Sequence, residues 1–193
     1  MRLTTERLIL RPPVAGDIDA IFEGMSDWEV VKTLARPPWP YERQDAARWL
    51  AMQDDLRADG QKTALMLALK TAPERAIGCA GLEAREDGQV HLGFWLARSC
   101  WGLGLMTEAC AELLRYGFED LGLARIHSGC FRDNEASRRV HQKLGFAVTG
   151  ESRILCVPRG ESVDHIDLAL TRADWAAANG AAGIGLAHAG ETR

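Results

Sequence analysis

A strand-like run that leads through two glycines into a helix constrains this chain more than any other stretch. His91–Leu96 has the composition of a strand, and from Leu105 onward apolar residues recur four positions apart, as on one face of a helix. Between the two lie Gly102 and Gly104. The first N–H groups of a helix have no partner within the helix, and the helix dipole adds positive charge there. The sequence therefore predicts an anion-binding turn at the start of this helix.

Two familiar phosphate-binding patterns do not fit this turn. A P-loop needs Gly-Lys-Ser/Thr after a longer glycine spacing, and the stretch from Arg98 to Ala109 contains no lysine. A dinucleotide-binding turn needs a third glycine where Thr107 stands, and an acidic residue about 20 positions further on. The anion must therefore belong to another kind of ligand.

Residues Trp101–Ala109 read Trp-Gly-x-Gly-x-x-Thr-Glu-Ala, which resembles the RimJ/RimL-like branch of the GNAT superfamily of acetyl-CoA-dependent N-acetyltransferases. Ser99 stands where the general signature has Gln or Arg, whereas Thr5–Pro12 resembles the opening strand of the branch. The resemblance implies acetyl-CoA as the co-substrate, with its pyrophosphate on the glycine turn. The residues expected at the turn are Trp101, Gly102, Leu103, Gly104, Leu105, Met106 and Thr107.

The composition fits one globular domain and shows no excess of positive charge of the kind that binds nucleic acid. The chain has 193 residues, of which 47% are hydrophobic and 26% charged, and its formal net charge is −4. The five cysteines are scattered, odd in number and without a C-x-x-C pair, so we expect reduced thiols and no metal site. No apolar signal core or 18-residue apolar run occurs, which favours a soluble cytoplasmic protein that contacts neither membrane nor nucleic acid.

The expected elements alternate in a way typical of an α/β or α+β fold with a mixed sheet. The predicted strands are 3–12, 63–70, 76–84, 89–96, 124–131, 146–157 and 162–170, and the predicted helices are one capped by Asp17, 43–59, one from 105 to about 121, and a short one after Asp133 or Asn134. The resemblance implies a mostly antiparallel GNAT-type sheet flanked by about four helices, with the cofactor cleft between two splayed central strands. We expect one domain over residues 1–175 and a flexible Ala/Gly-rich tail over 176–193.

A second cluster of site residues lies in the short helix, Asn134–Phe146. The stretch resembles the GNAT pattern Asn-x-x-Ala/Ser-x-x-Leu/Val-Tyr-x-Lys-x-Gly-Phe. The resemblance gives Asn134 and Ser137 hydrogen bonds to the pantetheine arm, whereas Lys143 fits either a ligand or a helix C-terminal cation. His141 replaces the tyrosine that often protonates the departing thiolate, so we expect it either to act as that acid or to pack in the core.

Acyl transfer from a thioester to an amine needs a base and a group that polarises the carbonyl. The polarising group would be a backbone N–H near Trp95 or Leu96. Glu83 and His91 compete for the base, and a two-residue turn at Asp87-Gly88 would place them on opposite sheet faces unless a bulge shifts the register.

The pair Asp164-His165 resembles a recurrent feature of the branch and is expected to shape the cleft or support structure.

The leading hypothesis is acetylation of a protein or peptide N-terminal α-amine, for which a ribosomal protein is one candidate partner. Two alternatives stay open: a small-molecule amine such as an aminoglycoside or polyamine, and a non-catalytic acyl-CoA-binding protein. Substrate choice is expected to depend on the segment from Trp28 to Tyr41 and the loop at Val157–Ser162. Whether the protein forms a homodimer is left open.

Overall fold

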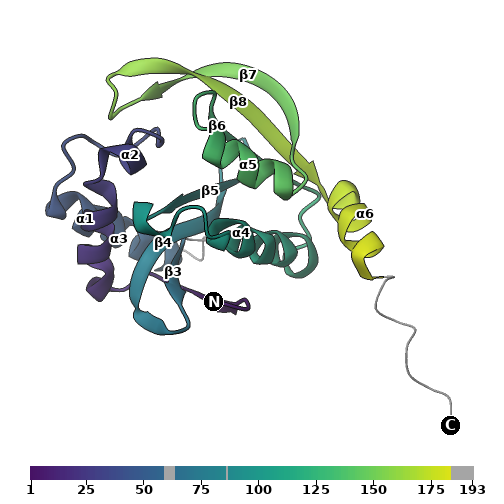
Figure 1. Ribbon diagram of the computed structural model, residues 1–193, viewed down its shortest axis with the longest axis horizontal. Coiled ribbons are helices and arrows are strands. Elements are labelled where there is room, and N and C mark those ends of the chain that lie inside the picture. The colour runs from purple at the N-terminus through teal and green to yellow at the C-terminus, as the bar shows by residue number, and fades with distance from the viewer. Residues whose placement is uncertain (59–63, 86, 184–193) are drawn as a thin grey trace, which may run out of the picture.

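A single sheet of eight strands forms the centre of the computed structural model, which describes residues 1–58, 64–85 and 87–183 (Figure 1). The strand order is β1-β2-β3-β4-β5-β6-β8-β7, and every neighbouring pair is antiparallel except β5 and β6, which are parallel. The strands are β1 Leu3–Thr4, β2 Leu8–Arg11, β3 Leu65–Leu69, β4 Ala72–Ala84, β5 Val90–Leu96, β6 Arg125–Phe131, β7 Ala147–Cys156 and β8 Glu161–Thr171.

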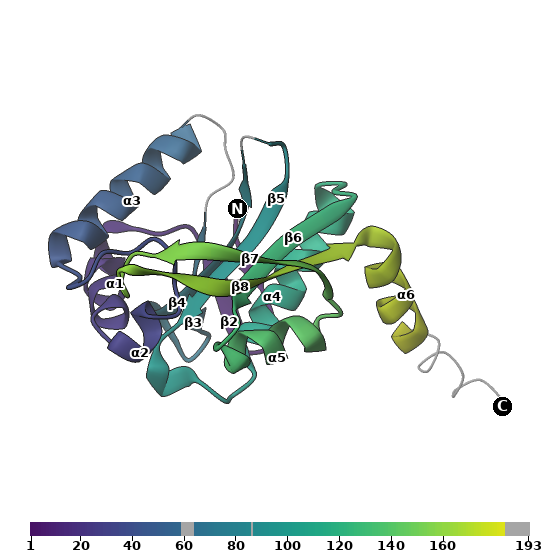
Figure 2. The same ribbon diagram turned by 90° about the horizontal axis from the view of Figure 1, so that it is seen from above.

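Helices cover both faces of the sheet, because successive side chains along each strand point to opposite faces. Leu82, Leu92 and Leu168 pack with α4, whereas Met66 and Cys79 pack on the other face, with α1 and α3 (Figure 2). The α-helices are α1 Ile18–Met25, α2 Trp28–Val31, α3 Arg43–Ala58, α4 Leu105–Arg115, α5 Glu135–Lys143 and α6 Arg172–Gly183. The expected mixed, mostly antiparallel sheet is confirmed, although the described residues hold six helices where about four were expected.

The two central parallel strands separate almost as soon as they meet. The pair His91 and His127 is the one registered contact of β5 with β6 in the described part of the chain. Beyond it β5 stays paired with β4 as far as Leu96, and β6 stays paired with β8 as far as Phe131. The strands therefore diverge toward their C-terminal ends and leave a gap in the middle of the sheet, as expected for the cofactor cleft.

The β4–β5 turn differs from the predicted two-residue hairpin. Glu83 pairs directly with His91, and the Arg85 N–H donates to the Gln89 carbonyl, so the loop is one residue longer than predicted. Gly88 has a φ of 78°, which fits a three-residue loop that closes with a left-handed residue. The prediction that Glu83 and His91 lie on opposite faces is wrong, because a one-residue change of register moves one of them across the sheet.

Three further predictions about the N-terminal half need correction. The first strand is split into β1 and β2, because Thr5 N–H donates to the Leu8 carbonyl and reverses the chain. Asp17 does not cap α1: its buried carboxylate accepts hydrogen bonds from Arg11 and from Val14 N. The chain turns at 70–71, so that β4 begins at Ala72, earlier than the predicted strand at 76–84.

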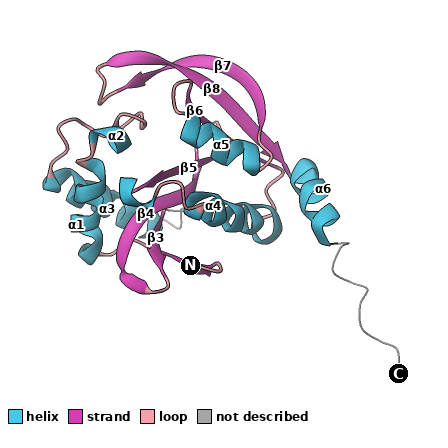
Figure 3. Cartoon of the chain, in the orientation of Figure 1, coloured by secondary structure: helices cyan, strands magenta, loops and turns pink. Residues whose placement is uncertain are grey.

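The C-terminal segment begins with a helix that the sequence did not predict. α6 runs from Arg172 to Gly183, whereas the flexible tail was expected to begin at residue 176 (Figure 3). Thr171 caps the helix by accepting from Asp174 N, and Trp175 packs on Phe118 with ring centroids 5.3 Å apart. The remaining tail, 184–193, and the expected boundaries at Asp59 and Thr63 lie outside the described residues. Within the described ranges, no helix has the length and apolar character needed to cross a membrane.

Candidate active site

The predicted anion-binding turn is built by two glycines in left-handed conformation. Gly102 and Gly104 have φ values of 77° and 76°, which residues with a Cβ adopt at a cost. Gly104 precedes α4 without a side-chain cap, and the helix makes its first backbone hydrogen bond from Glu108 N to the Gly104 carbonyl. Among the described residues, none accepts a hydrogen bond from the N–H groups of Leu105 and Met106. The turn thus offers unpaired donors at the positive end of α4, which fits a pyrophosphate.

A hydrogen-bond network from the turn between β1 and β2 fixes the other side of the glycine turn. The Glu108 carboxylate accepts from Thr5 Oγ1 at 2.5 Å, from Arg7 N at 2.8 Å and from Arg7 Nε at 2.6 Å. Arg7 Nη1 also donates to the Leu103 carbonyl at 3.0 Å. Leu103 itself is 58% exposed and is the one predicted turn residue that does not line the cavity described below. The two stretches that resemble the family, Thr5–Pro12 and Trp101–Ala109, therefore contact each other in the fold. The hydrogen bonds from the first stretch hold the second in its orientation.

The edge of β5 that faces the gap carries a free backbone donor. In an antiparallel pair, alternate residues direct both N–H and C=O to the same neighbouring strand. Ala97 N donates to β4, so Trp95 also faces β4, whereas Leu96 and Phe94 face the gap toward β6. The Leu96 carbonyl accepts from Trp101 Nε1 at 2.8 Å, which ties the glycine turn to the strand. Of the two residues whose N–H was predicted to polarise a carbonyl, Leu96 has the suitable orientation. The N–H of Phe94 also faces the gap, and the sequence analysis missed it because strand pairing decides which N–H groups face the gap.

α5 presents its predicted polar residues to the same cavity. Asn134, rather than Asp133, caps the helix, with Oδ1 accepting from Ser137 N at 3.1 Å. Gly145 ends it with a φ of 84°, as predicted. Ser137 is buried and Lys143 exposed, and both line the cavity together with Asn134. Their contact with the cofactor stays a prediction.

Asn134→Ala should separate the capping role from the binding role. Loss of a cap costs about 1 kcal/mol of unfolding free energy, and loss of the cavity-facing amide should weaken acetyl-CoA binding. The matched control is Thr171→Ala, which removes the cap of α6 away from the cavity. Chemical denaturation and acetyl-CoA titration should show similar destabilisation in both variants but weaker binding in Asn134→Ala alone. Equal acetyl-CoA affinities in the two variants would show that Asn134 acts only as a helix cap.

His141 lies beneath the cavity surface. It is 1% exposed, its ring packs against Phe94 and Phe146, and it does not line the cavity. Nδ1 lies 2.8 Å from the Ser137 carbonyl and Nε2 lies 2.7 Å from Ser128 Oγ, which also donates to the Leu92 carbonyl. Burial lowers its pKa to about 4, so the ring is neutral at pH 7. The ring contacts two serines that line the cavity, Ser128 and Ser137, and the role of His141 as the acid stays a prediction.

The two predicted bases lie side by side on the sheet face opposite α4. Arg36 forms a bidentate pair with Glu83, at 2.9 and 2.7 Å, and this hydrogen bonding lowers the pKa of Glu83. Burial, followed by the positive charges of Arg85 and His127, lowers the pKa of His91 to about 4. Both groups line the cavity, yet both environments make them weak proton acceptors.

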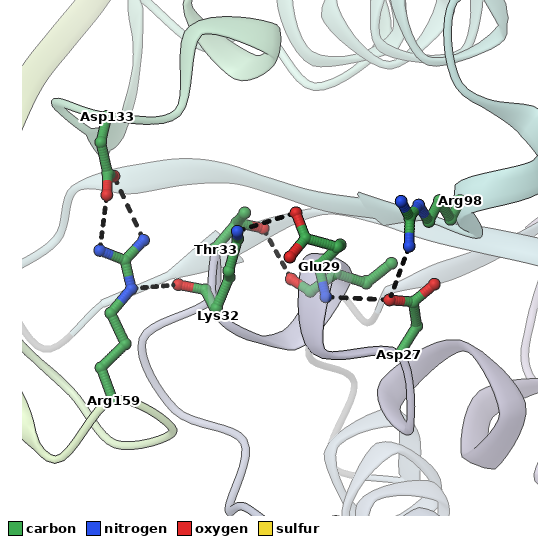
Figure 4. Close-up of polar contacts among 8 residues, drawn as sticks. Asp27, Glu29, Lys32, Thr33, Arg98, Asp133 and Arg159 are labelled. Atoms are coloured by element: carbon green, nitrogen blue, oxygen red, sulfur yellow. Dashed lines mark hydrogen bonds and ion pairs between the residues drawn. The ribbon is translucent and has the colours of Figure 1, made fainter.

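A polar cluster joins the β7–β8 turn to the segment after α2 (Figure 4). Arg159 makes a bidentate ion pair with Asp133, at 2.6 and 3.2 Å, and its Nε donates to the Lys32 carbonyl at 2.8 Å. Val157 N donates to the Ala35 carbonyl, and the Cys156 thiol contacts the Leu34 carbonyl at 3.4 Å. The two segments expected to select the substrate are therefore tied together next to Asn134. Sequence reasoning missed Arg159 because its partners are more than 20 residues away in the chain.

The glycine turn, the edge of β5, the polar residues of α5, the two predicted bases and Arg159 all line one cavity of about 1730 Å³. The glycine turn and α5 line the side of α4, while α2, α3 and the cluster around Arg159 line the opposite side. The gap between β5 and β6 connects them. A ligand with a phosphate on the α4 side can thus meet a second molecule that enters from the α2 side.

Comparison with known proteins agrees with this geometry. Residues 7–147, more than half of the chain, match the family model described as "Acetyltransferase (GNAT) domain". The chain therefore belongs to the GNAT family, and it is an acetyl-CoA-dependent acetyltransferase.

Among its relatives is the uncharacterized N-acetyltransferase p20 of Bacillus licheniformis, 31% identical over 176 residues that cover 90% of this chain and 98% of p20. The [ribosomal protein uS5]-alanine N-acetyltransferase of Escherichia coli is 28% identical, covering 91% of this chain and 93% of that protein. The microcin C7 self-immunity acetyltransferase MccE, solved with acetyl-CoA and AMP, has the same fold with a TM-score of 0.72. At 19% identity, the alignment with MccE covers 86% of this chain and 93% of that chain. The predicted RimJ/RimL-like branch is thus confirmed.

Proposed function

We propose that this acetyltransferase modifies the free α-amino group of a protein or peptide N-terminus, with a ribosomal protein as one candidate acceptor. The uS5-alanine acetyltransferase among its relatives supports a protein N-terminus. The five free cysteines fit the reducing cytoplasm, where ribosomal proteins are found.

The observation that carries the proposal is the weakness of the two predicted bases. Glu83 is held as a carboxylate by Arg36, and His91 has its pKa lowered to about 4. An α-amine has a pKa of about 7.7–8.0, whereas a lysine side chain has about 10.4. Deprotonating a lysine side chain at pH 7 therefore costs roughly 3.3 kcal/mol more free energy than deprotonating an α-amine. The two pKa values differ by about 2.4 units, and each unit corresponds to about 1.36 kcal/mol. Neither Glu83 nor His91 can offset the cost of deprotonating a lysine ammonium, which favours the amine that is already partly neutral.

A peptide panel tests the acceptor class. One peptide has a free N-terminal alanine and no lysine; its partner has a blocked N-terminus and one internal lysine; spermidine and an aminoglycoside represent small amines. We expect kcat/KM, measured by thiol release, to be at least about 100-fold higher for the free α-amine, in line with its larger neutral fraction. The logarithm of kcat/KM should rise with pH and level off near the pKa of the amine.

Two outcomes would contradict the proposal. One is mass mapping that places the acetyl group on lysine side chains of peptides with free N-termini. The other is turnover of spermidine or the aminoglycoside alone, which would assign the enzyme to small-molecule amines.

A further inference from the structure

β8 carries a histidine and an aspartate two residues apart that the site described above does not use. Nδ1 of His165 lies 2.9 Å from Oδ1 of Asp167, and Ser152 Oγ donates to the same oxygen at 3.0 Å. An ionised carboxylate only accepts hydrogen bonds, so Nδ1 must carry the proton. In the neutral ring, the lone pair is then on Nε2.

The His165 ring lies directly against a glycine of β6. A Cβ built on Gly129 would lie 2.1 Å from Cε1 of His165 and 2.6 Å from Nε2, so the space that a side chain would take is filled by this edge of the ring. The His165 side chain is 15% exposed and lines the cavity, as does Gly129. No hydrogen bond to Nε2 is seen within the described chain. The basic nitrogen therefore lies at the edge of the gap between β5 and β6 without a competing protein partner.

Register places this nitrogen on the acceptor side of the sheet. His165 pairs with Phe131 and Asp167 with Gly129, so these side-chain positions share the face of His91 and Glu83, opposite α4. On the other side of β6, Ser128 leads to His141.

We propose that His165 is the general base for acetyl transfer and that Asp167 is the positioning residue that fixes its tautomer. The inference rests on acetyl transfer and not on the identity of the acceptor. The amine nitrogen bonds to the thioester carbonyl carbon and gives one proton to Nε2. The C–S bond breaks with its electron pair going to sulfur, and the proton passes through water to the thiolate. The products are the N-acetyl amine and CoA thiol, and His165 returns to its neutral form.

The neighbouring Asp164 has a different role. It lies on the opposite face of β8 and is paired, at 3.5 Å, with the exposed Arg153. The pair Asp164-His165 was expected to shape the cleft or support structure. Strand alternation instead separates the two residues and joins His165 with Asp167, which share a face.

His165→Gln should lower kcat/KM by about 100-fold, since a positioned base contributes at least that much in typical enzymes. The acceptor is the alanine-starting peptide, or spermidine if the peptide is not acetylated, so failure of the proposed acceptor class does not hide the result. Acetyl-CoA affinity, measured by titration, should change less than twofold. Imidazole added to His165→Ala should restore part of the rate, which a purely structural role would not allow.

Asp167→Asn tests the positioning role without removing the ring. We expect kcat to fall about tenfold at unchanged KM for acetyl-CoA, and the ¹⁵N signals of the His165 ring to shift from the single Nδ1–H tautomer toward a mixture. His127→Gln is the matched control: it is a histidine on the same face that does not line the cavity, and its kcat/KM should stay within twofold of wild type.

A rate for His165→Gln within threefold of wild type would overturn the proposal. So would a loss of acetyl-CoA affinity that accounts for the whole loss of rate. If His165→Gln does not fold, Asp167→Asn decides, because an unchanged kcat and tautomer in that variant would also overturn it.

Discussion

Replacing Gly104 with valine should reduce acetyl-CoA affinity by at least 100-fold. Gly104 has a φ of 76°, a conformation that is strained for a β-branched residue, and it directly precedes the unpaired N–H groups of α4. A valine would either hold the side chain where the pyrophosphate must approach or force the turn into another conformation. Titration with acetyl-CoA and the thermal shift at saturating acetyl-CoA measure the loss. For the wild type, ligand at about 100 times Kd adds about 2.7 kcal/mol to the free energy of unfolding.

Gly88→Val is the control for backbone strain. Gly88 has nearly the same φ, 78°, and an added Cβ there meets no atom within 4 Å, but it lies in the β4–β5 turn and does not line the cavity. Both variants should lose similar stability, whereas acetyl-CoA affinity should fall in Gly104→Val alone. Normal affinity in folded Gly104→Val would show that the glycines only form a turn.

Glu108→Ala should cost about 3 kcal/mol of unfolding free energy and weaken acetyl-CoA binding about tenfold. The carboxylate is 17% exposed and accepts three hydrogen bonds, of which those from Thr5 Oγ1 and Arg7 N are each worth roughly 1.5–3 kcal/mol as bonds to a charged group. The third, from the half-exposed Arg7 guanidinium, is screened by water and adds less. Binding should weaken because Arg7 would no longer be held against the Leu103 carbonyl.

The stability difference between wild type and Glu108→Ala should depend on pH. Burial alone would raise the pKa of Glu108, but hydrogen bonds from Thr5 and Arg7 lower it below the ordinary value of 4.5. A group with a lowered folded-state pKa stabilises the fold above its unfolded pKa and loses that effect as pH falls through the folded value. Urea denaturation should therefore show the full difference at pH 7 and a shrinking one below about pH 4.5.

Glu23→Ala serves as the comparison for Glu108→Ala, because Glu23 forms an exposed ion pair with Arg75 at 3.3 Å. Exposed pairs contribute about 0–1 kcal/mol, so this variant should stay close to wild type at every pH. A similar small effect for Glu108→Ala would mean that the network is not needed for stability.

The cofactor side of the site could be predicted from the sequence because its residues are close together in the chain. The left-handed glycines, the start of α4, the cap at Asn134 and the stop at Gly145 all depend on local backbone geometry. Such features need no knowledge of distant contacts. The contact of Glu108 with Thr5 and Arg7 is different: both motifs were recognisable, but their meeting across about 100 residues was not.

The acceptor side was decided by the tertiary structure. One additional residue in the β4–β5 loop brought Glu83 and His91 to the same face, since side chains alternate with a period of two. Burial between Phe94 of β5 and Phe146, which follows α5, keeps His141 below the cavity surface. The sequence by itself determined the family and the glycine turn before α4, because short-range geometry encodes them. Which side chains face the amine was determined by strand register, burial and long-range packing.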